Sequence, residues 1–201
     1  MAFDRGFLRE SPLVVAPALL GAHLTVGGVT VRLTEVEAYL GVGEDPGSHS
    51  FRGQTPRNAT MFGDAGHLYV YFTYGMHTCA NVVAGPEGES GGVLLRAGEI
   101  VNGVELARER RTTSRSHADL ARGPARLAVA LGITMGDNGV DLENGRVRLD
   151  VAAPASAHLI STGPRTGVSG AGGGDDYPWR FWLTGDPTVS PYKRHTPKKR
   201  P

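Results

Sequence analysis

The segment His23–Tyr39 (HLTVGGVTVRLTEVEAY) decides the fold class, because it contains two strand-like runs around a tight turn. The pair Gly27-Gly28 separates His23–Val26 from Val29–Tyr39, and adjacent glycines favour the two-residue turn of a β-hairpin. The second run is long and rich in β-branched residues, which favour an extended backbone. We therefore expect an antiparallel hairpin in this segment.

Similar patterns predict further strands. The run His67–Thr73 is the clearest, because apolar residues alternate with tyrosines along it. A tight turn at Tyr74-Gly75-Met76 should lead into a return strand over residues 77–84. We also expect strands over 93–96 and 180–184, and hairpin turns at Asn138-Gly139 and Asn144-Gly145.

Helices are expected in three places. Ser11-Pro12 can start the first helix, although Pro17 allows a later start, and Gly21 should end it. Residues 103–112 are amphipathic, and a third helix should run from Gly123-Pro124 to just before Gly132. Residues 40–66 and 163–178 read as loops. Because strands and helices mix without a regular βαβ alternation, we predict an α+β fold.

Composition narrows the possible functions. The chain has 201 residues and one cysteine, which excludes a disulfide framework and a cysteine-rich metal site. The seven histidines do not cluster at ligand spacings, so we expect no metal and no cofactor. No leader peptide or membrane-spanning run is visible, so we expect a cytoplasmic protein without membrane contact.

The charges are unevenly placed along the chain. Residues 192–201 hold five basic residues and no acid, whereas residues 1–191 hold 16 arginines and 20 acidic residues. We therefore expect one domain over 1–191 and a basic, flexible tail over 192–201. By itself, a mildly acidic body argues against nucleic-acid binding.

One group of residues on the long hairpin arm could carry chemistry. Glu35, Glu37 and Tyr39 alternate, which places them on one face of a strand. A carboxylate beside an aromatic ring can act as a general base next to a planar substrate. An exposed strand face with ordinary charges is the simpler alternative, and the pattern alone leaves both open.

A second group contains the tyrosines of the next hairpin. Tyr69 and Tyr71 share a strand face, and Tyr74 lies at the tip, where core packing explains an aromatic residue poorly. Such a side chain can act as a wedge between nucleic-acid bases, although a structural role stays open. The loop 49–58 adds two arginines and several hydrogen-bonding groups, which suit phosphate or base contacts.

These groups belong to a series of short motifs that occur in a fixed order: TEVEAYLG (34–41), HS (49–50), TPRN (55–58), MF (61–62), LYVY (68–71), YGM (74–76) followed by Asn81, LLRA (94–97), GP (123–124), PRTG (164–167) and RF (180–181). Together they resemble the alkylpurine (3-methyladenine) DNA glycosylase family, of the single-domain methylpurine type, over about residues 11–189. The resemblance implies a curved antiparallel sheet flanked by helices, with a protruding β-hairpin that inserts into DNA.

The resemblance also implies a mechanism. A damaged purine is flipped out of double-stranded DNA, and Glu37 activates the water that cleaves the N-glycosidic bond. Arg96 and the backbone carbonyl of Thr166 match groups that help to hold this water. The implied substrates are 3-methyladenine and 7-methylguanine, with neutral lesions such as hypoxanthine or ethenoadenine reacting less readily.

The remaining implied roles concern binding. The predicted base pocket consists of Tyr39, His49, Tyr71 and Asn81, with Asn81 excluding guanine. The predicted DNA contacts are Tyr74, Met76, Arg52, Arg57, Arg165 and Arg180. His77, Thr78 and Ala80 depart from the family pattern, which leaves the choice among neutral lesions open.

The lysines bear on the reaction type. No lysine precedes Lys193, and a glycosylase that also cleaves the strand needs an amine for a Schiff base. We therefore expect a monofunctional enzyme that leaves an abasic site and works as a monomer in a bacterial cell, near the nucleoid. Two alternatives stay open: a glycoside hydrolase that uses Glu35 and Glu37 as a carboxylate pair, and a non-catalytic protein that binds damaged DNA.

Overall fold

Strand β2 (Val29–Tyr39) lies at the centre of the fold. In the computed structural model, which describes residues 3–73, 75, 77–151 and 155–196, β2 pairs in antiparallel fashion with three strands, β1 (His23–Val26), β5 (Gly92–Asn102) and β9 (Arg180–Leu183). Both glycines of the Gly27-Gly28 turn have positive φ, at 51° and 88°. Glycine adopts this conformation at no steric cost, so the predicted hairpin is confirmed.

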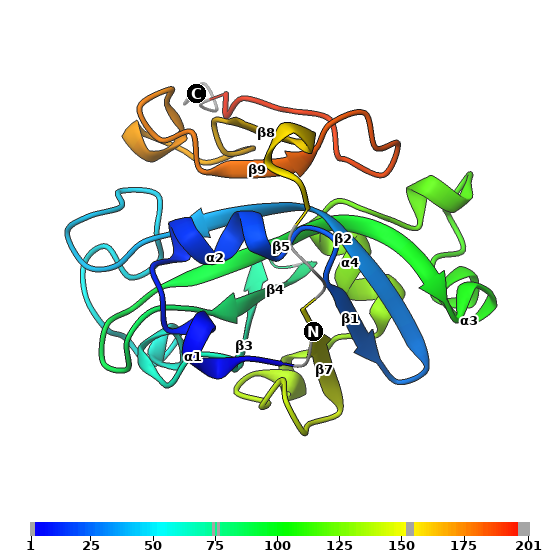
Figure 1. Cartoon of the computed structure of the whole chain (residues 1–201), viewed down its shortest axis with the longest axis horizontal. Coiled ribbons are helices and arrows are strands. Elements are labelled where there is room, and N and C mark those ends of the chain that lie inside the picture. The colour runs from blue at the N-terminus through cyan, green and yellow to red at the C-terminus, as the bar shows by residue number, and fades with distance from the viewer. Residues whose placement is uncertain (1–2, 74, 76, 152–154, 197–201) are drawn as a thin grey trace.

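The other strands extend an antiparallel sheet outward from β2 (Figure 1). One path through the sheet runs β3-β4-β5-β2-β1-β7, where β3 is Leu68–Thr73, β4 is His77–Val83 and β7 is Val147–Asp150. Three short strands of the described chain lie off this path: β6 (Ala121–Arg122) pairs with β5, β9 pairs with β2, and β8 (Ile160–Gly163) pairs with β9. The described strands do not close into a barrel.

Short helices accompany the sheet. The α-helices are α1 (Arg5–Leu8), α2 (Pro12–Ala18), α3 (Val104–Arg110) and α4 (Pro124–Leu131). Single 3₁₀ turns lie at η1 (Ala59–Phe62), η2 (His117–Asp119), η3 (Met135–Asp137), η4 (Ala157–Leu159) and η5 (Ala171–Gly173). Helix α2 packs on β2, and α4 packs on β4 and β5 around one continuous hydrophobic core. Among the described residues, no helix is long and apolar enough to cross a lipid bilayer.

The fold confirms the predicted α+β class of antiparallel sheet and helices, with differences in single elements. Helix α2 starts at Pro12 behind the N-cap Ser11, and Pro17 lies in its last turn, where the helix is about to end. Strand β5 runs far beyond the predicted residues 93–96, because it pairs with β2 along almost its whole length. The strand β8 lies partly inside a segment predicted to be irregular.

The predicted hairpin turn at Asn138-Gly139 is wrong, whereas a turn does lie at Asn144-Gly145, where the Leu149 amide donates to the Leu142 carbonyl at 2.9 Å across it. The first segment instead runs beside the edge strand β3, where the Gly139 amide donates to the Leu68 carbonyl at 2.7 Å. The Asn138 side-chain oxygen accepts from the Val70 amide at 3.0 Å. These long-range contacts with β3 replace the local hairpin that the sequence favours.

A register irregularity in β2 shapes the functional region. Between Leu33 and Val36 the regular pairing of β2 with β5 is interrupted on both sides of Glu35. Before this point the buried apolar residues of β2 occupy odd positions (Val29, Val31, Leu33), and after it they occupy even positions (Val36, Ala38). Such irregularities re-aim side chains. As a result, the odd-numbered positions Glu35, Glu37 and Tyr39 carry polar groups away from the apolar core.

Candidate active site

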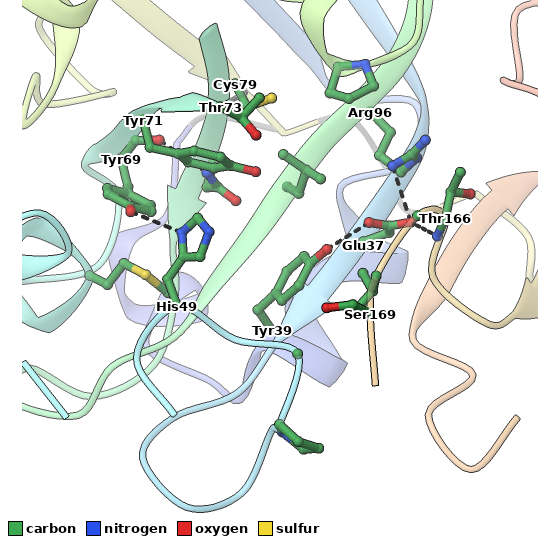
Figure 2. A pocket seen from close by; sticks show the side chains of 18 residues that line it. Glu37, Tyr39, His49, Tyr69, Tyr71, Thr73, Cys79, Arg96, Thr166 and Ser169 are labelled. Atoms are coloured by element: carbon green, nitrogen blue, oxygen red, sulfur yellow. Dashed lines mark hydrogen bonds and ion pairs between the residues drawn. The ribbon is translucent and has the colours of Figure 1, made fainter. Parts of the chain in front are cut away.

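A cavity of about 420 Å³ opens beside the C-terminal half of β2 (Figure 2). Segments far apart in the sequence form its wall: β2, the loop between β2 and β3, the hairpin β3–β4, β5 and the loop after β8. The volume suits a small planar molecule such as a nucleobase. The polar and aromatic lining residues are Glu37, Tyr39, His49, Tyr69, Tyr71, Thr73, Cys79, Asn81, Arg96, Thr166 and Ser169.

Glu37 is the carboxylate of this cavity, and its side chain is fully buried. One carboxylate oxygen accepts the Tyr39 hydroxyl at 2.9 Å, and the other accepts the Thr166 amide at 2.7 Å. The Arg96 guanidinium lies 3.3 Å from the second oxygen. These contacts fix the orientation of the carboxylate and balance its charge, while one side of it faces the cavity (Figure 2). A carboxylate held in this way can accept a proton from a bound water molecule.

Glu35 is also buried, but it does not line the cavity. Its carboxylate accepts from Arg96 at 2.8 Å, from Arg180 at 2.7 Å, and from the Ser190 hydroxyl and amide at 2.9 and 2.6 Å. Burial alone would raise the pKa of Glu35, but the two arginines and the Ser190 hydrogen bonds outweigh it and hold this pKa below its ordinary value. Glu35 is therefore a structural anion that orients Arg96.

This geometry bears on the sugar-hydrolase alternative. A glycoside hydrolase needs two carboxyl groups that flank the bond to be broken. Only Glu37 of the β2 pair lines the cavity, whereas the Glu35 carboxylate is buried and accepts from Arg96, Arg180 and Ser190. The structure thus offers no support for the carboxylate pair.

Aromatic rings form most of the wall opposite Glu37. The rings of Tyr69 and Tyr71 stack with centroids 5.5 Å apart, and the His49 ring meets Tyr71 edge-on at 4.5 Å. His49 Nδ1 and the Tyr69 hydroxyl share a hydrogen bond of 3.2 Å. Figure 2 shows Tyr39 on the side nearer to Glu37, apart from the other three rings. A flat, electron-deficient molecule can stack in the space between them.

The titratable groups of this wall are neutral at physiological pH. Burial raises the pKa of Tyr69 to about 12 and that of Tyr71 further above its ordinary value. Burial, with the nearby Glu37 charge, also raises the pKa of Tyr39. Loss of water around the His49 ring and the positive charge of Arg57 lower the pKa of His49. Within the described residues, the carboxylate and guanidinium side chains that line the cavity are those of Glu37 and Arg96.

Asn81 lies on the floor of the cavity with 5% of its surface exposed. Its amide donates to the Tyr69 carbonyl at 3.2 Å, across the β3–β4 pair. This bond fixes the side chain at one position, so a substituent on a bound ring would meet it at a defined place. Cys79 also reaches the cavity, where burial raises the pKa of its thiol, so it is a poor nucleophile.

Comparison with known proteins agrees with this geometry. The family model described as methylpurine-DNA glycosylase (MPG) matches residues 6–187. The chain belongs to the methylpurine-DNA glycosylase family.

Curated relatives of this glycosylase carry a consistent name. A protein of Leifsonia xyli is 58% identical over 193 residues, which cover 92% of this chain and 90% of the relative. One from Streptomyces avermitilis is 53% identical over 203 residues (98% and 94% of the two chains), and one from Nocardia farcinica is 55% identical over 189 residues (91% and 88%). Each is named "Putative 3-methyladenine DNA glycosylase". The chain is a DNA glycosylase, a hydrolase that acts in the repair of alkylated DNA.

The glycosylase brings all seven predicted catalytic and base-pocket residues to one cavity. These residues are Glu37, Tyr39, His49, Tyr71, Asn81, Arg96 and Thr166. The sequence reasoning did not assign Tyr69, Thr73 or Ser169 to the pocket. Tyr69 could have been predicted, because it alternates with Tyr71 along β3 and therefore shares its face of the strand. Ser169 could not, because only the path of its loop brings it to the cavity wall.

Two predicted DNA contacts of the glycosylase need correction. Arg165 and Arg180 are only 1% and 4% exposed. Arg165 pairs with Asp45 at 2.6 Å, and Arg180 pairs with Glu35 at 2.7 Å. A guanidinium that is buried against a carboxylate cannot reach a phosphate of DNA, so both arginines support the site from inside the protein.

The other predicted DNA contacts lie either on the surface or outside the described residues. Arg52 and Arg57 are exposed, and Arg57 donates to the Phe72 carbonyl of the β3–β4 hairpin at 3.0 Å. The predicted DNA contacts Tyr74 and Met76 lie outside the described residues. The tail from Tyr192 begins along the cavity wall, since the Gly167 amide donates to the Lys193 carbonyl at 2.8 Å.

The described residues contain no group of three or more His, Cys, Asp or Glu side chains placed to hold a metal ion.

Proposed function

We propose that this protein is a monofunctional DNA glycosylase that removes cationic alkylated purines, such as 3-methyladenine and 7-methylguanine, from double-stranded DNA. A base within a duplex is inaccessible, so the damaged nucleotide must rotate out of the stack to enter the cavity. The observation that carries the proposal is Glu37, a buried carboxylate held beside Arg96 at one side of a cavity whose opposite wall consists of aromatic rings.

The proposed reaction is a hydrolysis at the sugar. The Glu37 carboxylate takes a proton from water, and the water oxygen bonds to the anomeric carbon. The bond from that carbon to the purine nitrogen breaks, and its electron pair leaves with the base. A cationic base becomes neutral in this step and needs no proton, so a single general base suffices. The Arg96 guanidinium, 3.3 Å from Glu37, helps to hold the carboxylate in position for this step.

The flipped base is proposed to stack between Tyr39 and Tyr71. An alkylated purine carries a positive charge, and an electron-rich ring attracts a cation by about 1–2 kcal/mol in a dry site. Neutral lesions lack this attraction and need help at the leaving group, so they should react more slowly. Asn81, which the Tyr69 carbonyl holds in place, is proposed to disfavour undamaged guanine, because a neutral guanine lacks the cation attraction that offsets the contact for 7-methylguanine.

Insertion into DNA is proposed for the β3–β4 hairpin. Arg57, exposed and bonded to Phe72 near the hairpin tip, can meet a phosphate there, and Arg52 lies in the same loop. Tyr74, which follows β3 in the sequence, is the proposed wedge that fills the gap left by the flipped base.

Glu37→Gln tests the proposal directly. The amide keeps the size of the side chain but cannot accept the proton, so base release from methylated duplex DNA should fall by several orders of magnitude while lesion binding persists. Glu44→Gln is a matched control, because Glu44 is exposed and lies outside the cavity. Base release that survives in Glu37→Gln would show that Glu37 is not the base. Binding without release in the unsubstituted protein would instead identify a non-catalytic damage sensor.

A further inference from the structure

A buried ion pair lies directly behind one wall of the cavity. The guanidinium carbon of Arg165 is 4.4 Å from the centroid of the Tyr39 ring. Tyr39 lines the cavity and Arg165 does not, so the ring separates the cation from the space where a base would stack. Asp45 accepts both terminal nitrogens of Arg165 at 2.6 Å. Asp45 and Arg165 are 0% and 1% exposed, respectively.

The surrounding chain is built closely around this pair. Arg165 also donates to the carbonyls of Ala38 and Gly172 at 2.9 and 2.7 Å, so its nitrogens have partners. The amides of Leu40 and Gly47 donate to Asp45 at 3.1 and 2.8 Å. A Cβ at Gly47 would lie 2.5 Å from Arg165, which leaves room there for glycine only. The pair is therefore held in one arrangement, with no solvent to screen either charge.

We propose that the Asp45–Arg165 pair determines how strongly the glycosylase prefers cationic over neutral bases. Asp45 cancels the charge of Arg165, so the Tyr39 ring presents an electron-rich face to the cavity. This inference rests on the proposed function and deepens it. Neither residue touches the substrate; both act through the ring between them and the base.

The expected size of the effect follows from distance. A base stacked about 3.5 Å from the front of the ring would lie roughly 8 Å from the guanidinium carbon that is 4.4 Å behind it. If Asp45 were neutral, two unit charges would repel each other across this distance in a region of low effective dielectric constant. Coulomb's law then gives a loss of roughly tenfold or more in affinity for a cationic base. A neutral base would not feel this repulsion.

The test measures binding in a Glu37→Gln background, so that no base is released. Duplexes contain a single 7-methylguanine, which is cationic, or a single hypoxanthine, which is neutral. The preference is the ratio of the two Kd values, and it is measured for Asp45→Asn, Arg165→Met and the double variant. Because both Kd values come from one preparation, partial unfolding changes them equally and cancels in the ratio. Glu44→Gln, an exposed residue of the same loop, controls for the loss of one negative charge.

The two single variants should shift the preference in opposite directions. Asp45→Asn should lower the preference for 7-methylguanine about tenfold, Arg165→Met should raise it, and the double variant should return it to the starting value. If only one of the two single variants is soluble, the direction in which it shifts the preference decides whether the inference holds. Shifts in the same direction, or shifts no larger than that of Glu44→Gln, overturn the inference. Failure of the unsubstituted protein to release any base overturns the proposed function instead.

Discussion

Replacement of Glu35 by glutamine tests the buried network that supports the active site. The wild-type carboxylate receives four hydrogen bonds from Arg96, Arg180 and Ser190, all within 2.6–2.9 Å. Glutamine keeps the shape of the side chain but loses the charge and one acceptor. Whichever way its amide is turned, the NH₂ group faces a donor, either the Ser190 amide or the arginine nitrogens.

The expected loss of folding stability in Glu35→Gln follows from the burial of the network. Glu35 is 0% exposed, and Arg96 and Arg180 are 6% and 4% exposed, so solvent cannot replace the lost charge. Removing one partner of a buried ion pair costs about 3–5 kcal/mol. This is a large part of the roughly 5–15 kcal/mol by which a typical domain is stable. With a urea m-value of about 2 kcal/mol/M, the unfolding midpoint should fall by about 2 M.

Urea denaturation at pH 7 measures this loss, with the exposed Glu89→Gln as a control. The folded-state pKa of Glu35 is lowered, so its contribution to stability is complete above the pKa of about 4.3 of an unfolded glutamate and is lost as the pH falls through the folded-state pKa. The stability gap between the wild type and Glu35→Gln should therefore narrow below about pH 4. A loss of less than about 1 kcal/mol at pH 7, or a gap that does not change with pH, would refute the reasoning.

The other predictions concern the cavity and the reaction type. Tyr39→Phe keeps the ring but removes the 2.9 Å hydrogen bond to Glu37. Lesion affinity should be unchanged, and single-turnover base release should slow about tenfold. An unchanged rate of release would show that this hydrogen bond does not contribute to the reaction. Burial raises the pKa of Cys79, the only thiol in the chain; it should react with a thiol reagent at pH 8 mainly after unfolding, and rapid labelling of the native protein would contradict this. Borohydride treatment during turnover on lesion DNA should trap no covalent adduct; if one forms, Lys193→Ala will show whether the lysine beside Gly167 supplies the amine.

Several elements could be predicted from the sequence because their causes are local. The Gly27-Gly28 pair permits the positive φ angles of the hairpin, and helix α4 is bounded by Pro124 at its first turn and by Gly132, with φ of 69°, past its end. The placement of Glu37 beside Tyr39 also follows from the two-residue repeat of a strand. The roles of these residues came from the family resemblance rather than from the pattern.

The tertiary structure decided which charges belong to the interior. The sequence shows Arg52, Arg57, Arg165 and Arg180 as equivalent basic residues, and only the fold separates the exposed pair from the buried pair. Arg180 meets Glu35 because β9 pairs with β2, a contact between residues 145 positions apart. Arg165 meets Asp45 because two loops, 120 positions apart, pack behind Tyr39.

The active site therefore depends on both levels. The local sequence determines that Glu37 and Tyr39 share a strand face. The irregular register between Leu33 and Val36, and the buried arginines behind this face, depend on long-range pairing that no local pattern encodes. Backbone conformation follows from steric effects within a few residues, whereas burial of a charge depends on which distant segment supplies its partner.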